Sequence, residues 1–212
     1  MKSKCVIIGS GTYGQVYARY LDDLYSEIVF TDNESSLKNT IINGVKVIGH
    51  DDFALANLDP NIYDVYVPLG NVKVRRYVIN QFKEKGFNLP NYIHPSVNID
   101  KTVNIGEEAI YILEGTLIMP FVNIHNGVMI SVSTIIAHHT TLNSGVFISA
   151  GSNIGASINI NENAFIGISS TVMTGVKEIG EDSIIGAGTV VIRDVPAKST
   201  VVGNPARVIK SS

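Results

Sequence analysis

The chain has 212 residues, of which 45% are hydrophobic and 17% are charged, and its formal net charge is −3. This length can bury a sizeable core in one large or two small domains, and the charge offers no electrostatic footprint for nucleic acid. No apolar run is long enough to cross a bilayer, and the first apolar stretch is too short for a signal peptide, so we expect a cytoplasmic protein without membrane insertion. The single cysteine, Cys5, excludes an intramolecular disulfide framework and a thiolate metal cluster.

The first part of the chain, to about residue 90, alternates between strand-like and helix-like segments. Strands are predicted at 5–9, 27–32, 44–49 and 63–70, and helices at 13–24, 51–58 and 71–86. This alternation is typical of parallel strands joined by crossover helices. There is room for three or four such strands, which is about one mononucleotide-binding unit rather than the two that grip a dinucleotide.

A glycine-rich loop follows the first predicted strand, with Gly9, Gly11 and Gly14 in G-x-G-x-x-G spacing. In such loops the first glycine permits a tight turn, the second lets a phosphate approach the backbone, and the third allows close packing of helix on strand. Asp32 ends the next strand, at about the distance where an acid meets a ribose hydroxyl. The loop therefore predicts nucleotide binding, and the alternative is a glycine turn with a purely structural role.

The segment Leu-Gly-Asn at 69–71 ends another predicted strand and opens another helix. Ligands of open α/β sheets bind at the carboxyl edge of the strands. We therefore expect Gly70 and Asn71 to lie at the same edge as Gly11 and Asp32.

From residue 93 the sequence repeats every six residues. Six residues suit one flat side of a three-sided coil, with a short strand whose aliphatic residue points inward and a corner where Gly, Asn or Ser tolerates a positive φ. Three sides make a coil of 18 residues, so each residue lies about 4.8 Å below the residue 18 positions later. Residues 93–195 should give five to six coils. The inward positions are Ile93, Ile99 and Ile105, then every sixth residue from Ile112 to Val172, then Ile179, Ile185 and Val191.

A filled prism leaves only its outer faces, or the space between chains, for chemistry. His138 and His139 follow Ile136 in a predicted corner, and histidine exchanges protons near neutral pH. The 18-residue spacing places His138 one coil below Ala156. A backbone amide there could face a carbonyl oxygen while the imidazole faces an attacking amine or hydroxyl, which is the layout that acyl transfer needs. The alternative is a solvated surface histidine.

Motifs along the whole chain carry a resemblance to one family. They are IIGSGTYG, FTDN, LGN with Arg75 after it, YIHPS, the hexapeptides, STIIAHH, and the ending IGAGTVVIRDVPAKSTVVGNPARVI. The chain resembles the left-handed β-helix acyltransferases with an N-terminal half-Rossmann domain, a group that includes sialic acid O-acetyltransferases and bacillosamine-pathway nucleotide-sugar N-acetyltransferases. The resemblance implies an α/β half-Rossmann domain over 1–90, followed over 91–212 by an all-β left-handed parallel β-helix with a C-terminal extension.

The resemblance also implies a site and its ligands. Acetyl-CoA would be the co-substrate, without a tightly bound cofactor or a metal, and the active site would form between subunits of a homotrimer. His138 would be the general base beside His139, and the Ala156 amide would hold the thioester carbonyl. The nucleotide-sugar set comprises Gly9, Ser10, Gly11, Tyr13, Gly14, Asp32, Asn33, Gly70 and Asn71. The acyl-donor set comprises Ala156, Ile168, Ala187, Gly188, Arg193 and Arg207, with Lys198 as a further cation; the alternative for the cations is a solvated basic tail.

Three residues depart from the pattern of the family. Its catalytic histidine is usually followed by Asp or Glu, whereas the follower here is His139, which can accept a hydrogen bond but adds no negative charge. Tyr13 stands where the glycine loop often has a histidine. Phe147 stands where a bacillosamine-type enzyme has a histidine near the acceptor sugar. These departures bear on the acceptor more than on the reaction.

The first hypothesis is therefore acetyl-CoA-dependent N-acetylation of a nucleotide-linked amino-deoxysugar, as a step of polysaccharide biosynthesis. O-acetylation of a sugar hydroxyl at the same site comes second. A zinc hydratase that resembles the γ-class carbonic anhydrases is a third reading, in which His125, His138 and His139 would bind the metal, but their spacing lacks the His-x4-His pair of that group. A non-catalytic prism protein is the remaining alternative, and it is preferred to the hydratase.

Overall fold

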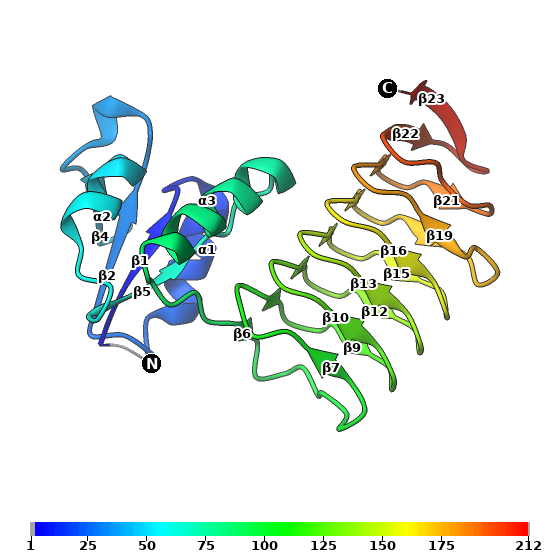
Figure 1. Ribbon diagram of the computed structural model, residues 1–212, viewed down its shortest axis with the longest axis horizontal. Coiled ribbons are helices and arrows are strands. Elements are labelled where there is room, and N and C mark those ends of the chain that lie inside the picture. The colour runs from blue at the N-terminus through cyan, green and yellow to red at the C-terminus, as the bar shows by residue number, and fades with distance from the viewer. Residues whose placement is uncertain (1–2, 212) are drawn as a thin grey trace. The chain divides into compact units, whose positions relative to one another are not determined.

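The computed structural model describes residues 3–211 and divides between Pro90 and Asn91 into two compact units (Figure 1). The first unit is built on a five-stranded sheet in the order β3-β4-β2-β1-β5. Its strands are β1 Lys4–Ile8, β2 Glu27–Thr31, β3 Ile41–Ile42, β4 Val45–Gly49 and β5 Tyr63–Tyr66. Its helices are α1 Thr12–Leu21, α2 Asp51–Asn57 and α3 Val72–Glu84, with a 3₁₀ turn at Ser35–Leu37.

Four strands of this sheet pair in parallel, as the alternation of segments predicts. The fifth, β3, was not predicted and pairs antiparallel with β4. The two strands are joined by Asn43 and Gly44, whose φ angles are +48° and +85°. An Asn-Gly pair is the strongest short signal for such a hairpin, because both residues tolerate positive φ. The sequence at 43–44 therefore carries the signal for this hairpin.

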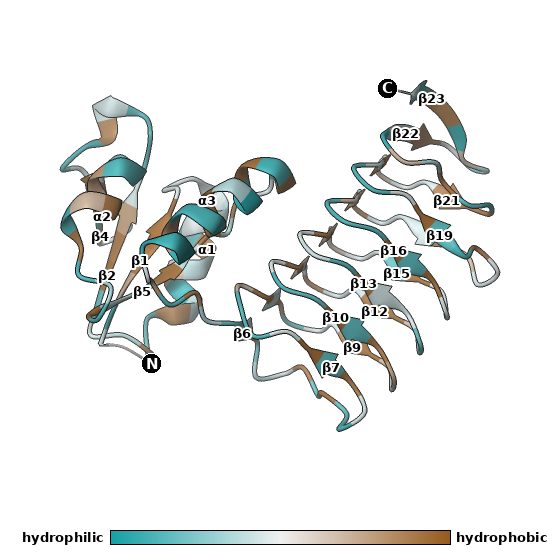
Figure 2. Cartoon of the chain, in the orientation of Figure 1, coloured by the Kyte–Doolittle hydropathy of each residue, from teal (hydrophilic) through white to brown (hydrophobic). Residues whose placement is uncertain are grey.

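The core of the first unit lies around β1, which is mostly brown in Figure 2. Cys5, Val6, Ile7 and Ile8 are all buried. Burial, and after it the nearby Asp64 carboxylate, raises the pKa of the Cys5 thiol far above its ordinary value. A thiol held in its neutral form is a poor nucleophile, which agrees with a packing role.

The second unit is a parallel β-helix whose short strands stack in three sheets (Figure 1). The β7 sheet contains β7 Asn104–Ile105, β10 Asn123–Ile124, β13 Thr141–Leu142, β16 Asn159–Ile160 and β19 Glu178–Ile179. The β9 sheet contains β9 Leu117–Ile118, β12 Ile135–Ile136, β15 Asn153–Ile154, β18 Thr171–Val172 and β21 Val190–Val191. The β6 sheet contains β6 Tyr92–Ile93, β8 Tyr111–Ile112, β11 Met129–Ile130, β14 Phe147–Ile148, β17 Phe165–Ile166, β20 Ile184–Ile185 and β22 Ser199–Val202, followed by β23 Arg207–Ser211.

The strand register confirms the 18-residue coil and both one-residue insertions. Ile136 pairs with Ile154 across one coil. The step becomes 19 residues where Ile105 pairs with Ile124, and again where Ile160 pairs with Ile179. These are the two places where the hexapeptide phase slips in the sequence.

The interior of the prism is solid. The inward aliphatic residues form one buried cluster from Val97 to Val201. Small polar residues two positions before them are also buried. Several of their hydroxyls donate to backbone carbonyls, as from Thr140 to Gly155 at 2.8 Å and from Ser152 to Gly167 at 3.0 Å. Because no room remains inside, any site must lie on the outside of the coils.

The coil continues one rung beyond the predicted end at residue 195, because Val201 of β22 pairs in parallel with Ile185. The next strand, β23, reverses direction and pairs antiparallel with β22. All five of its residues are exposed. Within residues 3–211, none of the helices has both the length and the apolar character needed to cross a membrane.

Candidate functional site

A hollow of about 200 Å³ opens at the glycine loop of the first unit. It lies at the carboxyl ends of β1 and β5, the edge at which the sequence predicts a nucleotide. The hollow brings four predicted loop residues together with Gly70. Its lining is Ile8, Gly9, Gly11, Thr12, Tyr13, Gly14, Pro68, Leu69 and Gly70.

The three loop glycines are present for different reasons. Gly9 has a φ of +88°, a conformation that other residues adopt only with strain. A Cβ on Gly14 would overlap the carbonyl oxygen of Gly9. Gly11, which precedes α1, has a φ of −65°, and a Cβ there would meet nothing within 4 Å. The fold therefore requires Gly9 and Gly14, whereas Gly11 keeps the floor of the hollow free of a side chain.

Asp32 is joined to the glycine loop. Its Oδ2 accepts hydrogen bonds from the Ser10 amide at 2.9 Å and from the Ser10 hydroxyl at 2.6 Å, and its Oδ1 accepts from the Glu34 amide at 3.0 Å. Partial burial acts to raise the pKa of Asp32, but these hydrogen bonds outweigh it and hold the pKa below its ordinary value. A carboxylate offers about four acceptor positions, so about one remains on Oδ1 for a ligand hydroxyl.

Two other residues predicted to bind the nucleotide have structural partners. The Asn33 side chain donates to Asp51 Oδ2 at 3.1 Å and accepts from the Asp51 amide at 3.3 Å. The Asn71 side-chain oxygen caps α3 by accepting from the Lys73 and Val74 amides, each at 3.1 Å. Asn71 thus orients the loop that carries Gly70, as helix N-caps commonly do.

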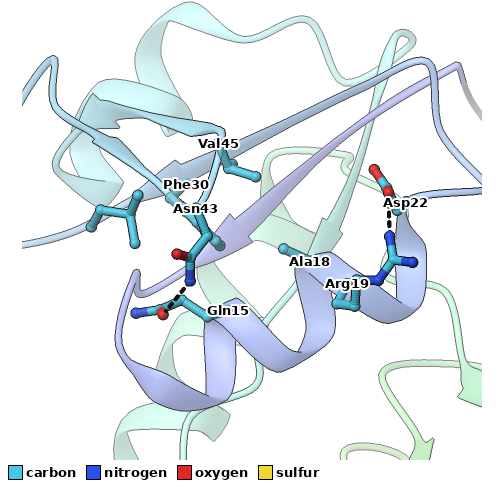
Figure 3. A pocket seen from close by; sticks show the side chains of 8 residues that line it. Gln15, Ala18, Arg19, Asp22, Phe30, Asn43 and Val45 are labelled. Atoms are coloured by element: carbon cyan, nitrogen blue, oxygen red, sulfur yellow. Dashed lines mark hydrogen bonds and ion pairs between the residues drawn. The ribbon is translucent and has the colours of Figure 1, made fainter.

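A second hollow of about 360 Å³ lies between α1 and the β3–β4 hairpin (Figure 3). Gln15 links its two sides to the loop, because Nε2 donates to the Ser10 carbonyl at 2.9 Å and Oε1 accepts from Asn43 at 2.8 Å. Its one arginine, Arg19, pairs with Asp22 on the same helix at 2.7 Å. Gln15, which the sequence did not single out, therefore ties the glycine loop to the hairpin.

Five residues share one corner of the prism and form what we call the His138 edge. Each lies two positions after the inward residue of a strand in the β9 sheet, and the pairing of these strands stacks them one coil apart. Ala156 therefore lies one coil above His138, as the 18-residue spacing predicts. From His138 to the last member the edge rises three coils, about 14 Å. In order along the axis the residues are Pro120, His138, Ala156, Thr174 and Arg193.

His138 and His139 are exposed and in direct contact. Their Nδ1 atoms lie 2.9 Å apart, and their rings meet edge to face. The His139 ring also lies over the ring of Phe121, with 4.8 Å between the ring centroids. Both residues have positive φ, +60° at His139 and +65° at Phe121, because they occupy the same left-handed corner position in successive coils. Phe121 was not singled out in the sequence, although its position 18 residues before His139 is a signal that could have found it.

The Ala156 amide, predicted to hold the thioester carbonyl, already has a partner. It donates to the hydroxyl oxygen of Thr174, one coil above, at 3.2 Å. The next amide, that of Ser157, donates to the His138 carbonyl at 3.0 Å. The backbone around His138 and Ala156 is therefore fixed, and Thr174 belongs to the site.

The acyl-donor set does not come together in one chain. Ile168 follows β17 and Ala187 follows β20, both in the β6 sheet, so they lie on a different corner from Ala156. The Gly188 amide donates to the Ile168 carbonyl at 2.8 Å, which stacks these residues along a second edge. Ala156 and Ile168 are two six-residue sides apart, so the separation could have been counted in the sequence. We call this corner, with Ile168, Ala187 and Gly188, the Ala187 edge.

Two of the three predicted cations lie together. Arg193 and Arg207 both line a hollow of about 370 Å³ near the end of the prism. Lys198 is not part of its lining and instead contacts Glu181 at 3.3 Å, on the surface. Arg193 also stands at the upper end of the His138 edge, which places one cation above the imidazole.

The remaining residues of interest have other surroundings. Phe147 is buried, and its ring packs edge to face with that of Phe165. His125 follows β10 in the β7 sheet, whereas His138 follows β12 in the β9 sheet. Over residues 3–211, no three His, Cys, Asp or Glu side chains gather in a group suited to a metal ion.

Comparison with known proteins finds one matching domain model and several similar structures. The family model of the PglD N-terminal domain matches residues 4–82. The acetyltransferase domain of PglB from Neisseria gonorrhoeae, in complex with acetyl coenzyme A, is similar over 99% of this chain and 100% of its own, with a TM-score of 0.91 and 29% identity. PerB from Caulobacter crescentus, in complex with CoA and GDP-perosamine, is similar over 98% of this chain and 97% of its own, with a TM-score of 0.86 and 28% identity. Residues 4–82 thus match a PglD-type N-terminal domain, and the whole chain has the fold of the PglB and PerB acetyltransferases.

The predicted fold class is thereby confirmed as a Rossmann-like unit followed by a left-handed parallel β-helix. A shorter match links the chain to the 2,3,4,5-tetrahydropyridine-2,6-dicarboxylate N-acetyltransferase of Clostridium perfringens, with 49% identity over 43 residues. This match covers 20% of the chain and 18% of that relative. The chain thus spans less than a fifth of the length of the curated relatives that it matches first.

Proposed function

We propose that this protein is an acetyl-CoA-dependent N-acetyltransferase that acts on the amino group of a nucleotide-linked amino-deoxysugar. The observation that carries the proposal is the His138 edge, where an exposed imidazole lies one coil below the Ala156 amide. The separation of one coil, about 4.8 Å, suits a base and a hydrogen-bond donor that act on two ends of one reacting centre. The named partners of PglB and PerB, acetyl coenzyme A, CoA and GDP-perosamine, support the same chemistry.

In the proposed reaction the acceptor amine attacks the carbonyl carbon of the thioester while His138 Nε2 removes a proton from the nitrogen. The carbonyl electron pair moves onto oxygen, where hydrogen-bond donors around Ala156 stabilise it. The C–S bond then breaks, and the thiolate of coenzyme A takes the proton from His138. The products are the N-acetylated sugar and free coenzyme A. General base catalysis of this kind contributes about 10²–10⁴-fold to the rate.

The short contact between the two histidines allows the tautomer that this role requires. Only one Nδ1 can carry the shared proton when both rings are neutral. If His138 donates from Nδ1 to His139, its Nε2 has a free lone pair and can act as a base. In the opposite arrangement His138 Nε2 carries the proton and cannot accept another. His139, held against Phe121, is thus assigned as the acceptor that orients His138.

The hollow at the glycine loop is assigned to the nucleotide of the sugar. The open backbone at Gly11 and the start of α1 suit a phosphate, because amides at a helix start face an anion. The free acceptor position on Asp32 suits one ribose hydroxyl. A nicotinamide reaction is not needed to explain the glycine motif.

We further infer a homotrimer in which the acyl donor lies between subunits. The two groups of predicted donor-binding residues lie on different corners of one prism, the His138 edge and the Ala187 edge. Two chains side by side bring one edge of the first chain to the other edge of the second, and a closed ring of three repeats that contact. Each site would then contain His138 and Ala156 of one subunit and Ala187 of the next.

The test is an acetylation assay with acetyl-CoA and matched nucleotide sugars that carry either an amine or a hydroxyl at the same carbon. Release of free thiol and the mass of the product identify the acceptor. Transfer to the amine supports the proposal, and transfer to the hydroxyl alone would make the protein an O-acetyltransferase. Thermal shift with acetyl-CoA and nucleoside diphosphates separates a non-catalytic protein, since a protein that binds neither is not stabilised by either. Stoichiometric zinc in the purified protein would favour the hydratase.

A further inference from the structure

The donor expected to stabilise the oxyanion is engaged within the chain. The Ala156 amide donates to Thr174 Oγ1 at 3.2 Å, so the hydroxyl oxygen occupies the position that a thioester carbonyl oxygen would take if it bound this amide directly. Thr174 is exposed, whereas Ala156 is buried. The group that the His138 edge presents to a ligand at this level is therefore the threonine hydroxyl.

This arrangement is absent from the Ala187 edge. At the equivalent place on that edge, the amides of Ala150 and Ile168 form no hydrogen bond to a side chain in the part of the chain that the structure describes. The residues one coil above them, Ile168 and Ala187, have no hydroxyl to offer. A side chain from one coil above covers the outward amide in two described places: Thr174 covers Ala156, and Asn126 covers Glu107 at 3.0 Å. Thr174 is the one of the two that lies on the His138 edge, and it covers the amide with a hydroxyl.

The local backbone explains how Thr174 reaches the amide. Thr174 belongs to the segment in which the coil gains its extra residue, between Val172 and Ile179. It forms an isolated bridge with Val176, and the Gly175 between them has a φ of +107°. This tight turn fixes the backbone of Thr174 at the corner directly above Ala156.

The chemistry of a hydroxyl decides what this contact can do. Thr174 Oγ1 accepts one hydrogen bond from the amide and keeps its own proton to donate. A hydroxyl that accepts a hydrogen bond becomes a better donor, because hydrogen bonds in a chain polarise one another. We propose that Thr174 is a catalytic residue of the transferase, whose Oγ–H, polarised by the Ala156 amide, donates to the carbonyl oxygen of the acetyl thioester.

This inference rests on the proposed acetyl transfer and names the donor at its oxyanion. Thr174 neither gains nor loses a proton in the step. The negative charge that forms on the carbonyl oxygen when the amine attacks is met by the hydroxyl hydrogen, and it returns to the C=O bond as the thiolate leaves. Removal of one such donor costs about 10²–10³-fold in kcat in other enzymes.

Two substitutions distinguish hydrogen-bond donation by Thr174 to the thioester from a role in which Thr174 only occupies the Ala156 amide. Thr174→Val keeps the shape of the side chain and removes the hydroxyl, and Thr174→Ser keeps the hydroxyl. For Val we expect kcat to fall about 10²-fold with the KM for acetyl-CoA little changed, and for Ser a kcat within a few-fold of wild type. If Thr174 only covers the amide, Val uncovers it, and kcat stays the same or rises. That result would overturn the proposal.

A second readout does not depend on turnover. Acetyl-CoA labelled with ¹³C at the carbonyl reports its hydrogen bonding by NMR, because a donor to the oxygen moves the carbon resonance downfield. We expect this shift in wild type and Thr174→Ser and its loss in Thr174→Val. An equal shift in all three proteins would reject Thr174 as the donor even if the acceptor sugar is never found. Labelled acetyl-CoA that binds none of the three proteins would instead contradict both the proposed function and this inference, and matching circular dichroism spectra would exclude misfolding.

Discussion

The Nδ1 atoms of His138 and His139 lie 2.9 Å apart on the surface of the prism. A second imidazole therefore stands where an orienting acceptor is needed, and the ring of Phe121 supports it from the coil below. A neutral imidazole can fix the tautomer of its neighbour, but it cannot stabilise the positive charge that the neighbour gains on taking a proton. The proposed base, His138, thus has a neutral imidazole rather than a carboxylate as its neighbour.

Replacement of His139 tests this reading. His139→Asp supplies an acceptor with a negative charge, and Asp tolerates the φ of +60° at this corner better than most residues. The charge favours protonated His138, so we expect the acidic limb of the kcat profile to move to higher pH, with kcat on the plateau equal or higher. His139→Phe keeps a ring over Phe121 but no acceptor, and should lower kcat about tenfold. A Phe variant with wild-type kcat would mean that His139 does not orient the base.

Loss of His138 itself should remove most of the activity without removing the acyl donor. For His138→Ala we expect kcat to fall about 10²–10⁴-fold. The thermal stabilisation by coenzyme A should remain, because Thr174, Arg193 and the Ala187 edge are untouched. Calorimetry with coenzyme A checks the binding, and retained kcat would refute the assigned base.

The glycines of the loop should separate fold from binding. Gly11→Ala adds a methyl group into open space at an ordinary φ, so the melting temperature should stay near that of wild type while nucleotide affinity falls at least tenfold. Gly14→Ala is the matched control, since its methyl group overlaps the Gly9 carbonyl and should destabilise the fold by about 1–3 kcal/mol. Calorimetry with nucleoside diphosphates gives the affinity. Unchanged nucleotide affinity in Gly11→Ala would show that the phosphate does not bind at the glycine loop.

Mixed oligomers test whether each site is shared. His138→Ala disables the His138 edge, and Ala187→Trp blocks the Ala187 edge. The two inactive proteins are mixed in equal amounts, unfolded and refolded together. If the acyl donor lies between subunits, a site is complete only where an intact His138 edge meets an intact Ala187 edge. Each intact edge is present in half of the subunits, so roughly a quarter of the wild-type sites should be restored. If each chain forms its own site, the mixture stays inactive. Light scattering gives the oligomeric state of the same samples.

Asp32 gives a pH dependence of stability. Its pKa is lowered in the folded protein, where partial burial is outweighed by the hydrogen bonds from Ser10 and Glu34. A group with a depressed folded pKa stabilises the fold above its ordinary pKa, about 3.9, and this contribution is lost as the pH falls through the folded value. We expect Asp32→Asn to be less stable than wild type near neutral pH, with a gap that closes below about pH 4.

Thermal unfolding between pH 3 and 7 measures this gap. Ser10→Ala removes the hydroxyl that donates to Asp32 Oδ2, so it should also narrow the gap, and the two changes should not be additive because they remove the same contact. If the difference in stability between wild type and Asp32→Asn stays constant down to pH 3, the charge of Asp32 is not what stabilises the fold.

The prism could be predicted from the sequence because one inward aliphatic residue recurs on every side, from Ile112 to Val172, and the phase slips where the coil gains a residue. The stacking of His138 under Ala156 follows from the same count. The contact of Thr174 with the Ala156 amide does not, because it depends on a turn conformation at Gly175 that no repeat specifies.

The first unit shows the same division. The alternating segments predict its parallel strands, and the motif predicts the hollow at the glycine loop. The hydrogen bonds between Ser10 and Asp32 join residues 22 positions apart, and only the packing of β1 beside β2 brings them into reach. The spacing of residues in the sequence thus predicts which of them share an edge. The positions of their side chains in the structure then show which polar atoms are already hydrogen-bonded.

The reversed strand β23 has a consequence for assembly in solution. A parallel ladder ends in a row of unsatisfied amides and carbonyls that could recruit another polypeptide and grow into a filament. Because β23 runs antiparallel to β22, the surface left at the end is a short strand with Arg207 and Lys210 in it, and like charges on such a strand discourage stacking of one molecule upon another. Removal of β23 should therefore make the protein prone to aggregate.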